Sequence, residues 1–209
     1  INPDIEKISK FCKEKNILLL EDAAHSFGST LNNKFAGTFG DAGVYSYYST
    51  KAIFAGEGGV AVTNNEKIGG LLKDFTAYDR FKQKMPIGCN IRLSEMQALM
   101  IFSVVNEYKT IIKNKSKIAE KYIEECEKAK IKYIDQNKNS NLGNYYKFTI
   151  ISPNGNIDKV FPGIKTTTSK VYDYALGRNK EIPKRHLCLP IWYDLDNTIS
   201  DKVLKELKN

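Results

Sequence analysis

The order of apolar and polar positions along the chain alternates between helical and strand-like stretches. Over residues 2–15, apolar side chains recur every three or four positions, which predicts a helix with Asn2 as its cap and Pro3 at its first position. Asn16 then breaks the pattern, and residues 17–20 form a wholly apolar run, typical of a strand buried on both faces. A helix, a break and a buried strand in this order are typical of a parallel α/β sheet.

The next part of the chain predicts short strands joined by turns, followed by one helix. Residues 28–45 are rich in Gly, Asn and Thr, and Asn32-Asn33 is a turn signal. The further elements expected are strands at residues 44–48 and 59–63, a glycine-rich loop at 56–59 and a helix at 66–79 capped by Asn65.

The clearest helix start of the chain lies at Ser94, because Ser94 and Gln97 have the spacing of a capping box. The helical pattern continues to about residue 130, with a kink near Asn106. The remaining expectations are a polar loop at 135–144, a strand at 145–151, a turn at 153–155, an irregular stretch at 166–184 and a final helix at 200–208. The change in composition after residue 106 predicts an α/β domain over 1–106, followed by a connecting helix and a small α+β domain over 107–209.

Composition narrows the class of protein. The chain has 209 residues, of which 42% are hydrophobic, so it can form a core without a metal or a disulfide. No apolar run approaches the ~20 residues of a membrane span, and the charged first ten residues do not resemble a signal peptide. The four cysteines form no C-x-x-C pair and no cluster with the two histidines, so we expect no metal site, and reduced thiols in a cytoplasmic protein.

The net charge of +8 by itself suggests binding to nucleic acid. Of the 32 basic residues, however, only four are arginine, the residue that dominates recognition of bases and phosphates. Lys, Asn and Ile are abundant together and all have A/T-rich codons, which explains the charge without a nucleic-acid partner.

Two residues with the potential for chemistry follow strand-like runs. Asp22 and Lys51 each lie at or just past the carboxyl end of such a run, where ligands bind in open α/β sheets. From their spacing alone, a plain ion pair is the first interpretation. The alternative is a site for pyridoxal phosphate, in which a lysine binds the cofactor covalently and a carboxylate keeps the ring nitrogen protonated.

Four segments, in order, resemble motifs of one enzyme family. Residues 21–28 (EDAAHSFG) are similar to the E-D-A-A-[QH]-x-x-G segment of the DegT/StrS-type sugar aminotransferases. Residues 39–51 (FGDAGVYSYYSTK), 56–59 (GEGG) and 88–98 (GCNIRLSEMQA) resemble the motifs that follow it in that family, and Cys188-Leu189-Pro190 is a weaker echo near the C-terminus.

This resemblance implies the fold of the fold-type-I pyridoxal-phosphate enzymes and gives roles to five residues. Lys51 would bind the cofactor and move a proton during the reaction, and Asp22 would pair with the ring nitrogen. His25 would lie beside the phenolic oxygen of the ring, with a structural histidine as the alternative, and Ser46 would contact the phosphate. Asn90 would reach the phosphate of the neighbouring subunit's cofactor, which implies a homodimer with shared active sites.

The implied reaction transfers an amino group, typically from glutamate, to a keto-sugar that is usually linked to a nucleotide. The product would be an amino sugar for a polysaccharide or a secondary metabolite. Sugar dehydratases of the same fold are an alternative, but they typically have histidine in place of Lys51. A non-catalytic binding or regulatory relative is a second alternative, and retention of Asp22, Ser46 and Lys51 argues against it.

Three departures from the family qualify this interpretation. Family members have a further N-terminal third before the position of Ile1, so we expect a truncated chain whose large domain is partial and which binds cofactor poorly alone. Ala52 stands where Asn is common. The C-terminal region is short, and residues 166–173 replace the more familiar substrate-domain segment, which leaves the sugar open.

Other polar and aromatic residues of the motifs have simpler interpretations. Tyr45, Tyr47 and Tyr48 are expected to pack in a half-buried strand rather than to stack on a substrate. Arg92 is expected to fix local structure, and Glu57 has no expected catalytic role.

Overall fold

The computed structural model describes residues 1–77, 88–138, 141–152 and 185–207. Its elements belong to two units, Ile1–Lys109 with Asn137–Gly143 and Thr110–Gln136 with Asn144–Asn209. The domain boundary expected at residue 106 stays a prediction.

Helix α1 (Ile5–Glu14) begins later than predicted. The Asn2 side chain accepts a hydrogen bond from the Asp4 N–H at 2.9 Å, which holds Pro3 and Asp4 in a turn before the helix. The prediction of Pro3 at the first helical position is therefore wrong. Asn16, with φ of 55°, ends the helical stretch as predicted.

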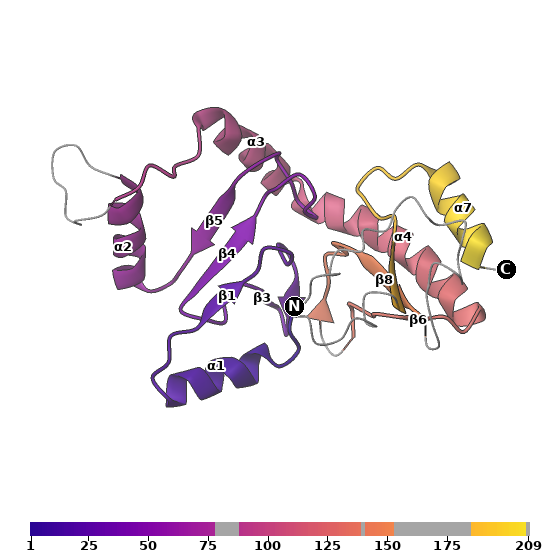
Figure 1. The fold of residues 1–209 in the computed structure, drawn as a ribbon, viewed down its shortest axis with the longest axis horizontal. Helices are drawn as coiled ribbons and strands as arrows, with labels where there is room; N and C mark the ends of the chain where they lie inside the picture. The colour runs from indigo at the N-terminus through magenta and orange to yellow at the C-terminus, as the bar shows by residue number, and fades with distance from the viewer. Residues whose placement is uncertain (78–87, 139–140, 153–184, 208–209) are drawn as a thin grey trace. The chain divides into compact units, whose positions relative to one another are not determined.

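The first unit contains a sheet in the order β1 (Leu20–Asp22), β4 (Ala42–Ser46) and β5 (Gly59–Val62) (Figure 1). Strands β1 and β4 are parallel, whereas β4 and β5 are antiparallel. A parallel pair that follows a helix confirms the predicted α/β class.

The prediction of a strand over residues 17–20 buried on both faces is wrong. The strand starts only at Leu20, and the side chains of Leu18 and Leu20 are 77% and 66% exposed. Leu19 points the other way and packs on a small core of Ile5, Leu31 and Phe39. Among the described residues β1 pairs only with β4 and is an edge strand with one open face, so a wholly apolar run did not mean burial on both sides.

A hairpin and a capped helix complete the first half of this unit. Strands β2 (Thr30–Leu31) and β3 (Lys34–Phe35) are joined by Asn32 and Asn33, whose positive φ angles of 49° and 63° suit a two-residue hairpin turn. Strand β7 (Asn141–Leu142) pairs with β2. Helix α2 (Glu66–Ala77) begins as predicted, because Asn65 Oδ1 accepts the Ile68 N–H at 3.2 Å.

The capping box at Ser94 is confirmed at the start of α3 (Glu95–Asn106). Ser94 Oγ accepts the Gln97 N–H, and Gln97 Oε1 accepts the Ser94 N–H. The predicted kink near Asn106 is a full break, because α3 ends there and α4 (Tyr108–Lys128) begins after Glu107.

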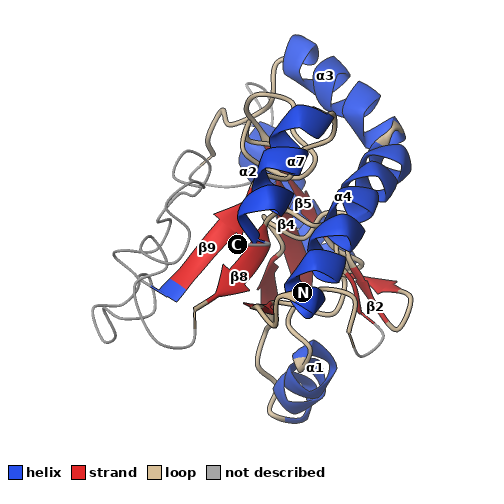
Figure 2. Cartoon of the chain, turned by 90° about the vertical axis from the view of Figure 1, so that its right-hand side faces the viewer, coloured by secondary structure: helices blue, strands red, loops and turns tan. Residues whose placement is uncertain are grey.

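In the second unit, α4 and α7 (Asn197–Leu207) pack on an antiparallel sheet in the order β6 (Lys132–Tyr133), β8 (Phe148–Ile151), β9 (His186–Leu189) (Figure 2). The expected strand at 145–151 begins only at Phe148, because Tyr145 has a positive φ of 47°. The predicted turn at 153–155 and the irregular stretch at 166–184 lie outside the described residues.

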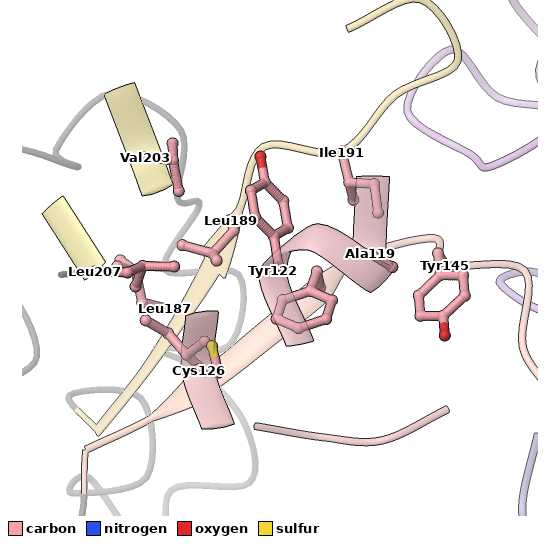
Figure 3. Close-up of a cluster of buried hydrophobic side chains, with 11 residues drawn as sticks. Ala119, Tyr122, Cys126, Tyr145, Leu187, Leu189, Ile191, Val203 and Leu207 are labelled. Carbon is pink, nitrogen blue, oxygen red and sulfur yellow. The ribbon is translucent and has the colours of Figure 1, made fainter. Parts of the chain in front are cut away.

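The core of this unit is built from both helices and two of the strands (Figure 3). The Tyr122 hydroxyl donates to the Pro190 carbonyl oxygen at 2.9 Å, so this buried ring keeps its polar end satisfied. The buried side chains of the core are Ala119, Tyr122, Cys126, Tyr145, Phe148, Ile150, Leu187, Leu189, Ile191, Val203 and Leu207.

All four cysteines are free thiols, of which Cys12, Cys126 and Cys188 are buried and Cys89 is exposed. Burial raises the pKa of Cys126 to about 12, with smaller contributions from Glu125 and Glu127, so this thiol stays protonated. In the part of the chain that the structure describes, no group of His, Cys, Asp and Glu is arranged to hold a metal ion. No helix over these residues has the length and apolarity to span a membrane.

Candidate active site

The register of the first sheet places Asp22 and Ser46 on the same face. Asp22 pairs with Val44 across the parallel ladder, and paired side chains point to the same side. Ser46 lies two residues beyond Val44 on β4, so it shares that face and lies ~7 Å further along the strand. A carboxylate and a hydroxyl therefore share one surface near the carboxyl ends of β1 and β4.

On this surface, called the Asp22 face below, the neighbouring residues of β5 are small. Ala61 pairs with Val44, and Gly59, which has no side chain, pairs with Ser46. The Asp22 side chain is exposed, and its Oδ1 accepts the Ala24 N–H at 3.0 Å. This face therefore presents the Asp22 carboxylate and the Ser46 hydroxyl on neighbouring strands.

The opposite face of the same strands is packed. Both oxygens of the buried Glu21 carboxylate accept backbone N–H groups, from Gly37 at 2.9 Å, from Gly40 at 2.7 Å and from Phe39. The sequence motif contains Glu21, but the motif by itself predicts no role for this residue. Its only sequence signal was a charged residue in the middle of a short strand.

Two of the three tyrosines pack on this face, as predicted. The Phe27 ring lies 5.2 Å from the Tyr45 ring and 5.5 Å from the Tyr47 ring, between centroids. Burial, with a smaller contribution from Tyr45, raises the pKa of Tyr47 to about 12, so its phenol is neutral near pH 7. Tyr48 differs from the expectation, because its side chain is exposed.

The segment after β4 forms a loop closed at one residue. The Tyr47 N–H donates to the Gly58 carbonyl oxygen, and the Tyr47 carbonyl oxygen accepts the Ala55 N–H, both at 2.9 Å. We call residues 48–57 the Lys51 loop. Because both closing bonds use the Tyr47 backbone, the loop starts and ends at the tip of β4.

Lys51 is held within this loop by its own backbone and its neighbours. Its N–H donates to the Tyr48 carbonyl oxygen at 2.9 Å. The next two residues, Ala52 and Ile53, are buried. An asparagine at position 52, common in the family, would need a hydrogen-bond partner in this buried place, whereas alanine needs none.

The segment that carries Asn90 packs on Gly58, the residue that follows the Lys51 loop. A Cβ atom placed on Gly58 would lie 2.9 Å from Leu93 Cδ2 and 3.0 Å from Ile101 Cδ1, so these side chains contact the glycine closely. Asn90 and Arg92 are exposed, just before α3. His25 is exposed in the turn that follows β1, where the Ser26 N–H donates to the Ala23 carbonyl oxygen at 2.8 Å.

The structure thus brings Asp22 and Ser46 to one face and places Lys51 in the loop that continues the strand of Ser46. The segment of Asn90 contacts Gly58, directly after that loop, through Leu93, and His25 follows the strand of Asp22. This donor set combines an amine, a carboxylate, a hydroxyl and an imidazole on one strand-and-loop framework. Such a set can hold a planar ligand with a basic ring nitrogen at one end and an anionic group at the other.

The chain is similar to known proteins of one enzyme family. The model of the DegT/DnrJ/EryC1/StrS aminotransferase family matches residues 1–170. GDP-perosamine synthase of Escherichia coli O157:H7 is 32% identical over 123 residues, which cover 57% of this chain and 34% of that protein. The chain thus spans about a third of the length of the curated relatives that it matches.

Solved structures share the fold. A DegT DnrJ EryC1 StrS aminotransferase from Brucella abortus superposes with a TM-score of 0.87 at 21% identity, over 100% of this chain and 61% of that one. The GDP-4-keto-6-deoxy-D-mannose-3-dehydratase of E. coli, solved with bound hydrated PLP, gives a TM-score of 0.77 at 22% identity, over 98% and 64%. These likenesses confirm the predicted fold class.

Proposed function

Since the chain belongs to the DegT/DnrJ/EryC1/StrS aminotransferase family, we propose that the protein is a pyridoxal-phosphate-dependent sugar aminotransferase. The observation that carries this proposal is the Asp22 face, with Ser46 on the same strand surface and the Lys51 loop continuing from it.

The residues present suit the cofactor. Asp22 would hold the proton of the ring nitrogen, because a carboxylate favours the charged pyridinium. Ser46 would donate a hydrogen bond to the phosphate, and His25 would lie beside the ring oxygen. The small side chain of Ala61 and the absence of one at Gly59, beside Val44 and Ser46, would leave room for a flat ring. When bound, the cofactor supplies an electron sink for negative charge at the substrate carbon.

Lys51 has two tasks in this proposal. Its amine would bind the cofactor covalently and, once displaced by substrate, would carry a proton from one carbon to another. The closed loop and the buried Ala52 and Ile53 favour this, because they restrict where the base of the lysine side chain lies.

For the substrates, we propose glutamate as amino donor and a nucleotide-linked keto-sugar as acceptor. The product would be an amino sugar for a polysaccharide or a secondary metabolite. The likeness to GDP-perosamine synthase supports a sugar bound to a nucleotide. The dehydratase neighbour shares the fold, but Lys51 favours transamination. Four free thiols suit a cytoplasmic protein.

We also propose a homodimer whose active sites are shared, with Asn90 reaching the phosphate of the partner's cofactor. Helix α3, which follows Asn90, supports a subunit contact because it exposes large apolar side chains. These exposed side chains are Met96, Leu99, Met100 and Phe102.

The proposal is tested by locating the covalently bound cofactor. The complete protein is loaded with pyridoxal phosphate, reduced with borohydride and digested, and the modified peptide is identified by mass spectrometry. We expect the label on Lys51, and loss of both the label and the visible absorbance of the bound cofactor in Lys51→Ala. Lys67→Ala, an exposed lysine on α2, is the matched control and keeps both.

The outcomes separate the alternatives. Labelling of another lysine in Lys51→Ala to the wild-type extent would contradict the assigned role. Wild-type protein that takes up no cofactor would favour a non-catalytic relative. Loss of water from the keto-sugar without gain of nitrogen would indicate a dehydratase.

A further inference from the structure

Glu21 and Asp22 are neighbours in β1 but face opposite sides of the sheet. Asp22 is exposed on its face, whereas Glu21 is only 8% exposed on the other. Glu21 Oε2 accepts the Gly37 N–H, and Oε1 accepts the N–H groups of Phe39 and Gly40. Three backbone donors therefore compensate the charge of one buried carboxylate.

These donors belong to residues 36–40, which we call the Glu21 loop, and this loop lies against the sheet backbone to backbone. A Cβ atom on Gly43 of β4 would lie 2.1 Å from the Gly37 carbonyl oxygen. A Cβ atom on Gly40 would lie 2.4 Å from the Leu19 carbonyl oxygen. Such close backbone contacts leave the loop no room to slide along the strands.

The same contacts decide which way β1 faces. The strand has three residues, and a slip of one residue turns every side chain to the other face. A slip would place either Leu20 or Asp22 where Glu21 now lies. The leucine accepts no hydrogen bond, and the aspartate is one methylene too short to reach the same three N–H groups. Only the observed register provides a carboxylate that accepts all three N–H groups of the Glu21 loop.

We propose that Glu21 is a positioning residue for Asp22: by binding the Glu21 loop it fixes the register of β1 and so holds the Asp22 carboxylate on the face that receives the cofactor ring. This inference rests on the proposed function, since it concerns the partner of the ring nitrogen. It adds a residue that touches neither cofactor nor substrate.

The test replaces Glu21 by glutamine. Glutamine keeps the size of the side chain but has one acceptor oxygen, and its NH₂ group would face a backbone N–H. Glu107→Gln, at the exposed end of α3, is the matched control. Both variants of the complete protein are loaded with pyridoxal phosphate labelled with ¹⁵N in the ring, because the nitrogen shift reports whether the ring nitrogen is protonated.

We expect Glu107→Gln to keep the wild-type shift and Glu21→Gln to move it toward the unprotonated value while covalent binding to Lys51 persists. In the cofactor-free protein, hydrogen exchange of residues 20–22 and 37–40 should become about fivefold faster in Glu21→Gln, since one net hydrogen bond lost is worth ~1 kcal/mol. An unchanged nitrogen shift with unchanged exchange would overturn the inference.

The wild-type protein provides a second measurement that does not depend on folding of the variant. If Glu21 holds the two segments together, amides 20–22 and 37–40 lose protection as one unit when denaturant is added. Separate opening of the two segments would also overturn the inference. Failure of the cofactor to bind wild-type protein contradicts the proposed function instead, and the exchange results still decide the role of Glu21.

Discussion

Lys115 is a buried cation on α4, with a side chain only 3% exposed. It lies on the same side of the helix as Ile112 and Ala119, which are buried as well. Burial lowers the pKa of Lys115 to about 8, because an apolar environment disfavours the charged amine. The unfolded chain keeps the ordinary value near 10.5, so folding releases a proton between these two pH values.

The lowered pKa of Lys115 makes the stability of the fold depend on pH. Between about pH 8 and pH 10.5 the unfolded state binds more protons than the folded state, so the contribution of Lys115 to the free energy of unfolding rises with pH. The rise amounts to about 3 kcal/mol over the whole window. We expect Lys115→Met to stabilise the protein at pH 7 by 1 to about 3 kcal/mol and to remove this rise.

Urea unfolding at pH 7 and pH 9.5 measures the effect, with Lys113→Met, an exposed lysine two positions away, as control. The comparison with the control cancels the titration of other groups. Equal pH dependence in the two variants would show that Lys115 is not buried as an unpaired amine.

At the level of elements, the start of α3 has the strongest local signal. Ser94 and Gln97 exchange two hydrogen bonds, which satisfy N–H groups that a helix start leaves open. We expect Ser94→Ala to lower the free energy of unfolding by about 1 kcal/mol. Ser103→Ala is the control on the same helix, because its hydroxyl donates only to the Leu99 carbonyl oxygen. Equal losses in thermal or urea unfolding would argue against the capping box.

Signals confined to a few neighbouring residues predicted the elements well. The capping box at Ser94, the cap at Asn65 and the Asn32-Asn33 turn are all confirmed, since each depends on bonds within about four residues. The burial of residues 17–20 was wrong because burial depends on what pairs with and covers a strand, and an apolar run does not contain that information.

In the candidate site, too, local motifs were predicted from the sequence, whereas contacts between distant segments were not. The motifs predict site roles for Asp22, Ser46 and Lys51, and the observed register puts the first two on one face. Glu21 and the contact of Gly58 with Leu93 were not foreseen, because each joins segments at least 16 residues apart. The sequence alone does not show which segments that are far apart in the chain come into contact in the fold.

At the scale of the whole molecule, the proposed sharing of active sites between two subunits can be tested with mixed dimers. If Lys51 of one subunit and Asn90 of the other complete one site, a mixed dimer of Lys51→Ala and Asn90→Ala subunits contains one site with both wild-type residues. Random exchange of subunits should then restore about a quarter of wild-type activity, because half of the dimers are mixed and each has one intact site of two.

The activity measured is conversion of the lysine-bound cofactor by glutamate. Each variant exchanged with itself is the control and should stay inactive or weak. If Asn90 serves its own subunit, no mixed dimer contains an intact site, so absence of any recovery after confirmed subunit exchange would exclude sharing through this residue.

Because the Tyr47 backbone closes the Lys51 loop, the sequence of this loop can vary in evolution without loss of its anchoring. Both closing bonds use main-chain groups alone, with Gly58 and Ala55 as partners. Substitutions among the exposed residues between them therefore leave the anchoring untouched. Selection can alter the side chains around Lys51 while the strand that carries Ser46 continues to form as before.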